Sequence, residues 1–229
     1  MHPLDGAFEQ LNGAREHIEM LRPELAAFRD SIAEGVSLNY EKGTRIINGR
    51  ESVVPIGTAS FTSSPAPPRA SRLIGEVAQN LRVALDYLIY ELSCFNIKST
   101  VKQTQFVIVD CEEDFSKEAR RRLRHLTAEQ KASVQRLQPY AGCHWTGLLR
   151  DLSNPSKHRH LTGVRAPVSI RLDRANTDAI LAGNLVDMND YATIQVAFTD
   201  GTPVIECLEQ LVTDVAQTLA DFGPEFERR

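Results

Sequence analysis

The stretch RASRLIGEVAQNLRVALDYLIYELSC, residues 69–94, carries a long and regular apolar pattern. Its apolar residues recur three or four positions apart and form one stripe: Leu73, Val77, Leu81, Leu85, Leu88 and Leu92. Ile74, Ala84 and Ile89 widen this stripe. Such spacing is typical of an amphipathic helix with one buried face, so we predict the central core helix of the protein here.

Segments on both sides of this helix have the same spacing. The further predicted helices cover residues 4–33, 112–125, 127–138, 144–153 and 203–222. The apolar stripe of the first includes Phe8, and Leu148, Leu149 and Leu152 are predicted to face inward in the helix 144–153. Thr127-Ala128-Glu129-Gln130 is a capping box, which marks a helix start. Pro23 lies inside the first helix and removes one backbone donor, so a kink or a break is expected there.

Three other segments favour strands or turns. Residues 36–62 contain Asn48-Gly49, a tight-turn dipeptide, between two alternating runs, which predicts a β-hairpin. Residues 63–68 form a Pro-rich connector, and residues 164–172 and 191–198 alternate like half-buried strands. The predicted fold class is therefore α+β: a bundle of about five main helices with a small antiparallel β-sheet. The length fits a single domain over residues 1–229.

The composition excludes several classes of protein. The net charge of −4 and the pI of about 5.9 give no global basic field, so binding of nucleic acid would need a local patch. No run approaches the length of a transmembrane span, so no membrane association is expected. The four cysteines are widely spaced, which indicates reduced, mostly buried thiols and a cytoplasmic protein.

The central helix also carries a polar set. Arg82 and Asp86 lie four residues apart on one face, and Glu91 follows. One interpretation is a solvated or interhelical ion pair. The other is a partly buried ligand-binding face, because buried charges need partners.

A candidate partner for this face is the segment 154–160. Asn154-Pro155 predicts a helix start, and Lys157, His158 and Arg159 follow it. Cationic groups beside fresh helical N–H donors suit an anion such as phosphate, and His158 could act as an acid or base near neutral pH. The alternative is a structural turn that locks the helices. No cofactor is expected.

Metal binding is not expected, although Cys143-His144 and His158-x-His160 could supply four ligands on paper. Adjacent residues and residues two apart on a helix do not face one another, and structural zinc sites use longer spacings.

A dense basic patch occurs at Arg120, Arg121, Arg122 and Arg124, followed by His125. One interpretation is a solvated helix face paired with Glu112, Glu113 and Asp114. The other is contact with a phosphate backbone.

Three motifs carry a resemblance to a known family: NLRVALDYLIYEL at 80–92, QPY at 138–140 and DLSNPSKHRHL at 151–161. With these motifs the chain resembles a broad bacterial family of uncharacterised proteins, over most of its length. It departs from that family at Tyr87, where His is usual, at Val107, where Pro is usual, and at Ser156, where Asp is usual. The departures at 87 and 156 remove an ionisable group.

A weaker similarity is to HEPN domains, helical bundles that are often ribonucleases of defence and toxin systems. Their Arg, four to six residues, then His motif fits Arg120 to His125. In HEPN domains this motif lies near the start of a late helix. The segment 154–160 has the corresponding place in the chain but does not have the spacing of the motif. The resemblance implies that His158 deprotonates a ribose 2′-hydroxyl and that Arg159 stabilises the charged phosphate, without a metal.

The sequence thus leads to two functional hypotheses. The first is a protein that binds a phosphate ligand, a nucleotide or RNA at Arg82, Asp86, Glu91, Asn154 and Lys157, with His158 and Arg159 as catalytic residues of a HEPN-like ribonuclease. The alternative is a non-enzymatic interaction or accessory module whose polar cluster is structural. The long first helix could pair with a second copy in a homodimer or pack within the chain.

Overall fold

The computed structural model describes residues 2–34, 36–47, 49–61, 67–154, 164–166, 168–170, 175, 178–179, 182 and 192–227. The chain divides into two compact units. The first comprises Met1–Arg22, Pro68–Gly163 and Val204–Arg229, and the second Pro23–Pro67 and Val164–Pro203. Two units are compatible with one domain that carries an appendage, so the single domain over residues 1–229 stays a prediction.

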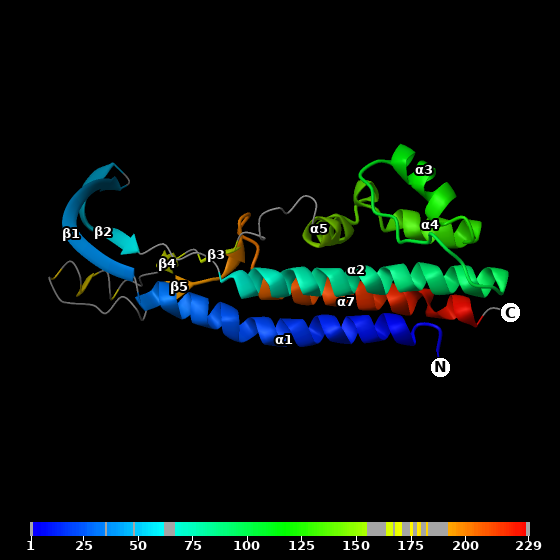
Figure 1. Cartoon of the computed structure of the whole chain (residues 1–229). Coiled ribbons are helices and arrows are strands. Elements are labelled where there is room, and N and C mark those ends of the chain that lie inside the picture. Colours follow the sequence, from blue (N-terminus) through cyan, green and yellow to red (C-terminus); the bar gives the residue numbers. More distant parts are fainter. Residues whose placement is uncertain are drawn as a thin grey trace. The chain divides into compact units, whose positions relative to one another are not determined.

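Helix α2, Pro68–Ile97, is the centre of the first unit. All six residues of its predicted stripe, from Leu73 to Leu92, are fully buried. In Figure 1, α1 (Asp5–Glu34) and α7 (Val204–Phe222) run alongside α2, and α5 (His144–Ser153) packs on α2 as well. The sequence pattern therefore identified the helix around which the bundle is built.

Helix α1 contacts α2 at two glycines, Gly6 beside Tyr87 and Gly13 beside Asn80. In the first unit, the buried apolar residues of α1 and of the residue just before it are Leu4, Ala7, Leu11, Ala14, Ile18 and Leu21. Phe8, which the predicted stripe included, is 38% exposed, because Ala7 takes the inward position and the next residue lies about 100° further round the helix. At Gly13 a Cβ atom would stand 2.8 Å from Nδ2 of Asn80 on α2. Of the two alternatives predicted at Pro23, the break is wrong, because α1 continues through this residue to Glu34, and the kink stays a prediction.

Three shorter helices complete the first unit beside α7. Helix α3 spans Glu112–Arg122 and so ends three residues before the predicted end, and α4 spans Ala128–Arg136. The capping box of α4 is confirmed: Thr127 Oγ1 accepts from the Gln130 N–H at 3.2 Å, and Gln130 Oε1 accepts from the Thr127 N–H at 3.0 Å. In α5 Leu149 is buried, but Leu148, also predicted to face inward, is 37% exposed.

Short 3₁₀ turns follow α4 and α7. The first, η1, spans Pro139–Ala141, and η3 spans Gly223–Phe226. Both begin beside a proline, which cannot continue the preceding helix.

The strands form two-stranded antiparallel pairs in the second unit. Strand β1, Val36–Ile47, pairs with β2, Arg50–Phe61, with Val36 opposite Phe61 and Ile47 opposite Arg50. Gly49 turns between them with a φ of 76°.

Two shorter pairs follow later in the chain. Strand β3, Val164–Arg165, pairs with β6, Ala197–Phe198, and β4, Val168–Ile170, pairs with β5, Ala192–Ile194. Of the predicted connector 63–68, residues 63–66 lie outside the described residues, and Pro68 begins α2. With six α-helices and small antiparallel pairs in the described residues, the α+β class is confirmed.

Candidate functional site

Arg82 and Asp86 hold the backbone of a single residue, Phe106. The Phe106 N–H donates to Asp86 Oδ1 at 2.8 Å, and Arg82 Nη2 donates to the Phe106 carbonyl oxygen. The two side chains lie 3.8 Å apart, from Arg82 Nη2 to Asp86 Oδ1. The face of α2 thus offers the backbone of Phe106 one donor and one acceptor, as a neighbouring strand would.

Gln138 holds the same segment a little further along. Its Nε2 donates to the carbonyl oxygens of Val107 at 2.8 Å and Val134 at 2.9 Å, and its Oε1 accepts from the Val109 N–H at 3.0 Å. Gln138 is fully buried. We call Arg82, Asp86 and Gln138 the backbone clamp. It fixes the buried residues Phe106, Val107 and Ile108.

The electrostatics of the clamp are those of a buried pair. Burial lowers the pKa of Arg82, and the charge of Asp86 opposes this while that of Arg150 adds to it. Burial raises the pKa of Asp86, against the attraction of Arg82, the Phe106 N–H and Arg122. Each charge compensates the desolvation of the other, so removal of one leaves the other buried without its partner.

Arg150 extends the polar cluster on the side of α5. Its Nη1 lies 2.8 Å from Asp110 Oδ1, and its Nε lies 3.0 Å from Asp151 Oδ1. Arg82 Nη1 and Arg122 Nε are buried and have no hydrogen-bond partner within the part of the chain that the structure describes. Of the whole cluster, the sequence pointed only to Arg82, Asp86 and, as part of the basic patch, Arg122. Gln138 belongs to the QPY motif noted in the sequence, whereas no sequence motif pointed to Arg150.

Glu91 does not belong to the clamp. Five residues separate it from Asp86, which places it about 140° away around the helix. No hydrogen bond or ion pair joins it to the clamp among the described residues, although burial raises the pKa of its carboxyl group. The prediction that Glu91 shares a site with Arg82 and Asp86 is therefore not supported by this geometry.

The second half of the predicted site lies largely beyond the described residues. Asn154 is the C-cap of α5, with a φ of −91° and a ψ of 94°. Lys157, His158 and Arg159 lie outside the described residues, as does the helix start predicted at Pro155. Their roles stay predictions.

The basic patch lies at the C-terminal end of α3 and in the turn that follows. Arg121 Nη2 contacts both carboxylate oxygens of Glu118, at 3.0 and 2.8 Å, and Arg122 Nε lies 3.7 Å from the same group. The predicted pairing with Glu112–Asp114 is wrong because helix side chains reach only three or four residues. Lys117 is the residue that pairs with Glu113 and Asp114, at 3.0 and 3.6 Å.

Two arginines of the patch have no carboxylate partner among the residues that the structure describes. Arg120 is exposed, and Arg124 donates through Nε to His125 Nε2 at 2.9 Å and through Nη2 to the Lys102 carbonyl oxygen at 3.4 Å. Lys102 is exposed as well. His125 lies in the turn after α3, where its carbonyl oxygen accepts from Asn96 Nδ2 at 2.9 Å. The lone pair of its Nε2 is already used, which does not suit a general base.

The described ranges contain no group of three or more His, Cys, Asp or Glu side chains that could hold a metal ion. None of their helices is both long and apolar enough to cross a membrane. Of the four cysteines only Cys207 is buried, Cys94 and Cys143 are half-buried and Cys111 is exposed, unlike the mostly buried thiols expected.

No protein-family model, no curated protein and no solved structure matches the chain. The two family resemblances therefore stay predictions, and the functional argument rests on the residues themselves.

Proposed function

We propose that the protein binds a phosphate-bearing ligand, with RNA as the first candidate, through the basic patch. The observation that carries the proposal is the set of exposed cations Lys102, Arg120 and Arg124, which have no carboxylate partner among the described residues. Cations that are already neutralised, such as Arg121, gain less from a phosphate. In a chain of net charge −4, this local patch supplies the attraction that the overall charge does not.

In this proposal Arg82 and Asp86 support the fold and do not contact the ligand. Their hydrogen-bonding groups are directed to Phe106, so a ligand at this face of α2 would have to displace a buried backbone contact. This observation favours the alternative hypothesis for the polar cluster. In that hypothesis the cluster has a structural role, within a non-enzymatic accessory module. The proposed binding surface is therefore the basic patch, and Arg82, Asp86 and Gln138 support the segment beside it.

Binding is tested with fluorescently labelled single-stranded RNA and anisotropy at several salt concentrations. We expect Arg120→Gln/Arg124→Gln to weaken binding and to reduce the slope of log affinity against log salt by about 0.7 for each lost phosphate contact. The matched control is Arg15→Gln/Arg45→Gln, which removes the same charge from exposed positions elsewhere. Equal losses in the two double variants would show only an effect of net charge and would refute the proposed surface.

The ribonuclease hypothesis adds a chemical step to this binding. His158 would take the proton of a ribose 2′-hydroxyl, the 2′-oxygen would attack the adjacent phosphorus, and the 5′-oxygen would leave with a proton. Arg159 would stabilise the charge on the phosphate. Incubation of labelled RNA with the wild type and with His158→Ala, both in the presence of a chelator, tests this step. If the wild type leaves the RNA intact, the ribonuclease hypothesis is refuted. The binding proposal is unaffected, because the anisotropy assay tests it separately.

A further inference from the structure

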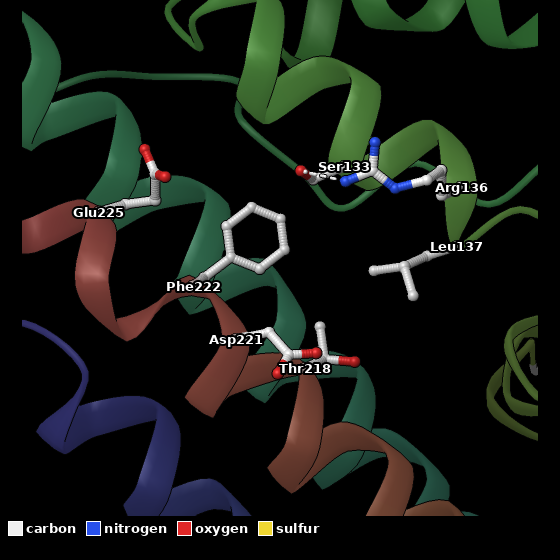
Figure 2. A pocket seen from close by; sticks show the side chains of 7 residues that line it. All are labelled: Ser133, Arg136, Leu137, Thr218, Asp221, Phe222 and Glu225. Atoms are coloured by element: carbon white, nitrogen blue, oxygen red, sulfur yellow. Dashed lines mark hydrogen bonds between the residues drawn. The ribbon is translucent and has the colours of Figure 1, made fainter.

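A pocket of 320 Å³ lies between α4 and the end of α7 with η3 (Figure 2). Its floor is apolar. Phe222 is 5% exposed, and Leu137 lies opposite its ring. Thr218 is also buried, and its hydroxyl donates to the Asp214 carbonyl oxygen of its own helix at 2.9 Å. The Thr218 hydroxyl is therefore already used, and Phe222 and Leu137 supply the apolar groups of the floor.

The walls of this pocket carry opposite charges. Figure 2 shows Arg136 on the α4 side, and Asp221 and Glu225 on the side of α7 and η3, with the ring of Phe222 between them. Two carboxylates four residues apart face one guanidinium. The pocket thus has a negative wall and a positive wall, separated by an apolar floor.

Arg136 and Asp221 do not neutralise each other, whereas Glu225 Oε2 accepts from Gln130 Nε2 at 3.1 Å. Arg136 Nη2 donates to Ser133 Oγ at 3.0 Å, and Asp221 Oδ1 accepts from Gln217 Nε2 at 2.7 Å. Within the described residues, Arg136 makes no ion pair with a carboxylate and Asp221 makes none with a cation. Arg136 and Asp221 therefore keep their charges available to a ligand that spans the floor.

We propose that this pocket binds a small zwitterion with an apolar side chain, of the amino-acid class. The protonated amine lies against Asp221, with Glu225 adding negative potential, and the carboxylate lies against Arg136. The apolar side chain covers Phe222. A guanidinium and a carboxylate are the groups that recognise this pair of charges by charge-assisted hydrogen bonds.

Size and charge set this ligand apart from the one proposed for the basic patch. The volume lies at the lower end of ligand pockets, which span about 300–1,000 Å³, so a single small molecule fills it. A phosphate ligand would meet two carboxylates and one arginine, and a simple amine would leave Arg136 without an acceptor. Because Arg136 and Asp221 are exposed, the contacts are screened and the expected affinity is in the millimolar range.

The test is a titration of the full-length, ¹⁵N-labelled protein with L-phenylalanine, followed by two-dimensional NMR. We expect saturable shifts confined to residues 133–137 and 218–225. N-acetyl-L-phenylalanine lacks the cationic amine and L-phenylalaninamide lacks the carboxylate, so each should bind about tenfold more weakly. Arg136→Gln and Asp221→Asn should weaken L-phenylalanine to the same extent. Arg15→Gln and Asp30→Asn, exposed charges outside the pocket, serve as matched controls.

The outcomes divide cleanly. Loss of affinity in both pocket variants and in both derivatives supports the proposal. Derivatives that bind as well as L-phenylalanine would show an apolar groove without charge recognition, and an absence of saturable shifts at millimolar concentrations would show no amino-acid site. Either result overturns the proposal. Neither bears on RNA binding, which depends on Arg120 and Arg124.

Discussion

Replacement of Gln138 by alanine should remove the part of the backbone clamp that has the most hydrogen bonds. The side chain makes three of them, to the Val107 carbonyl, the Val109 N–H and the Val134 carbonyl. The Val134 carbonyl keeps a second donor, the Leu137 N–H at 3.2 Å. Two backbone groups, the buried Val107 carbonyl and the half-buried Val109 N–H, therefore lose the partner that the clamp supplies.

The expected magnitude follows from these two groups. A buried polar group left without a partner costs about 1–3 kcal/mol, so Gln138→Ala should lower the free energy of unfolding by about 2–6 kcal/mol. The measurement is urea denaturation followed by circular dichroism, with the slope against urea checked for two-state behaviour. The matched control is Gln135→Ala, since Gln135 is only half-buried and donates one long bond, to Glu112 Oε1 at 3.3 Å. It should cost less than about 0.5 kcal/mol.

A second variant separates loss of bonding from loss of volume. Gln138→Glu keeps the shape but places a carboxylate oxygen against the Val107 and Val134 carbonyls, where the wild type has a donor. It should be destabilised at neutral pH and recover as the pH falls, because protonation restores an O–H donor. If Gln138→Ala costs no more than Gln135→Ala, the clamp does not hold the segment and the reasoning is refuted.

Three further substitutions follow from single positions. Burial raises the pKa of Asp86 above its ordinary value of 3.8, so the folded protein binds this proton more tightly than the unfolded chain does. The stability of the wild type relative to Asp86→Asn should therefore rise as the pH is lowered from neutral towards 3.8, and a constant difference in urea titrations would contradict this. Gly75→Ala should raise stability by about 0.5–1 kcal/mol, since it lies inside α2 and a Cβ atom there would meet nothing within 4 Å. Gly142→Ala should lower it by about 1–2 kcal/mol in the same assay, because its φ of 93° strains any residue with a Cβ atom.

The sequence predicted those parts of the fold that depend on local pattern. The α2 stripe appears in the sequence because burial on one side of a helix forces a period near 3.6, and the α4 start appears because both partners of its capping box lie within four residues. Leu148 was misplaced because an apolar residue next to a buried one was counted as buried. Such adjacent residues point about 100° apart on a helix.

The site was harder to predict because its contacts are long-range. Arg82 and Asp86 were recognised as a pair, but their common partner, Phe106, lies 20 residues beyond Asp86, and nothing in the local pattern indicates it. Glu91 is a different case, since its angle around α2 could have excluded it from the sequence alone. The pocket between α4 and α7 also escaped prediction: Arg136 and Asp221 are ordinary helix-surface residues until the fold brings them to the same cavity.

The backbone clamp has a consequence for which residues the chain can exchange. It contacts the peptide groups of residues 106–109 and not their side chains, and the Val107 N–H donates to no group in the part of the chain that the structure describes. Proline at position 107 would therefore sacrifice no hydrogen bond there. The clamp constrains the path of the segment, whereas burial of Phe106, Val107 and Ile108 constrains which side chains fit. Substitutions that keep the apolar volume should therefore be tolerated in this segment, while any loss of a polar group from the clamp should not.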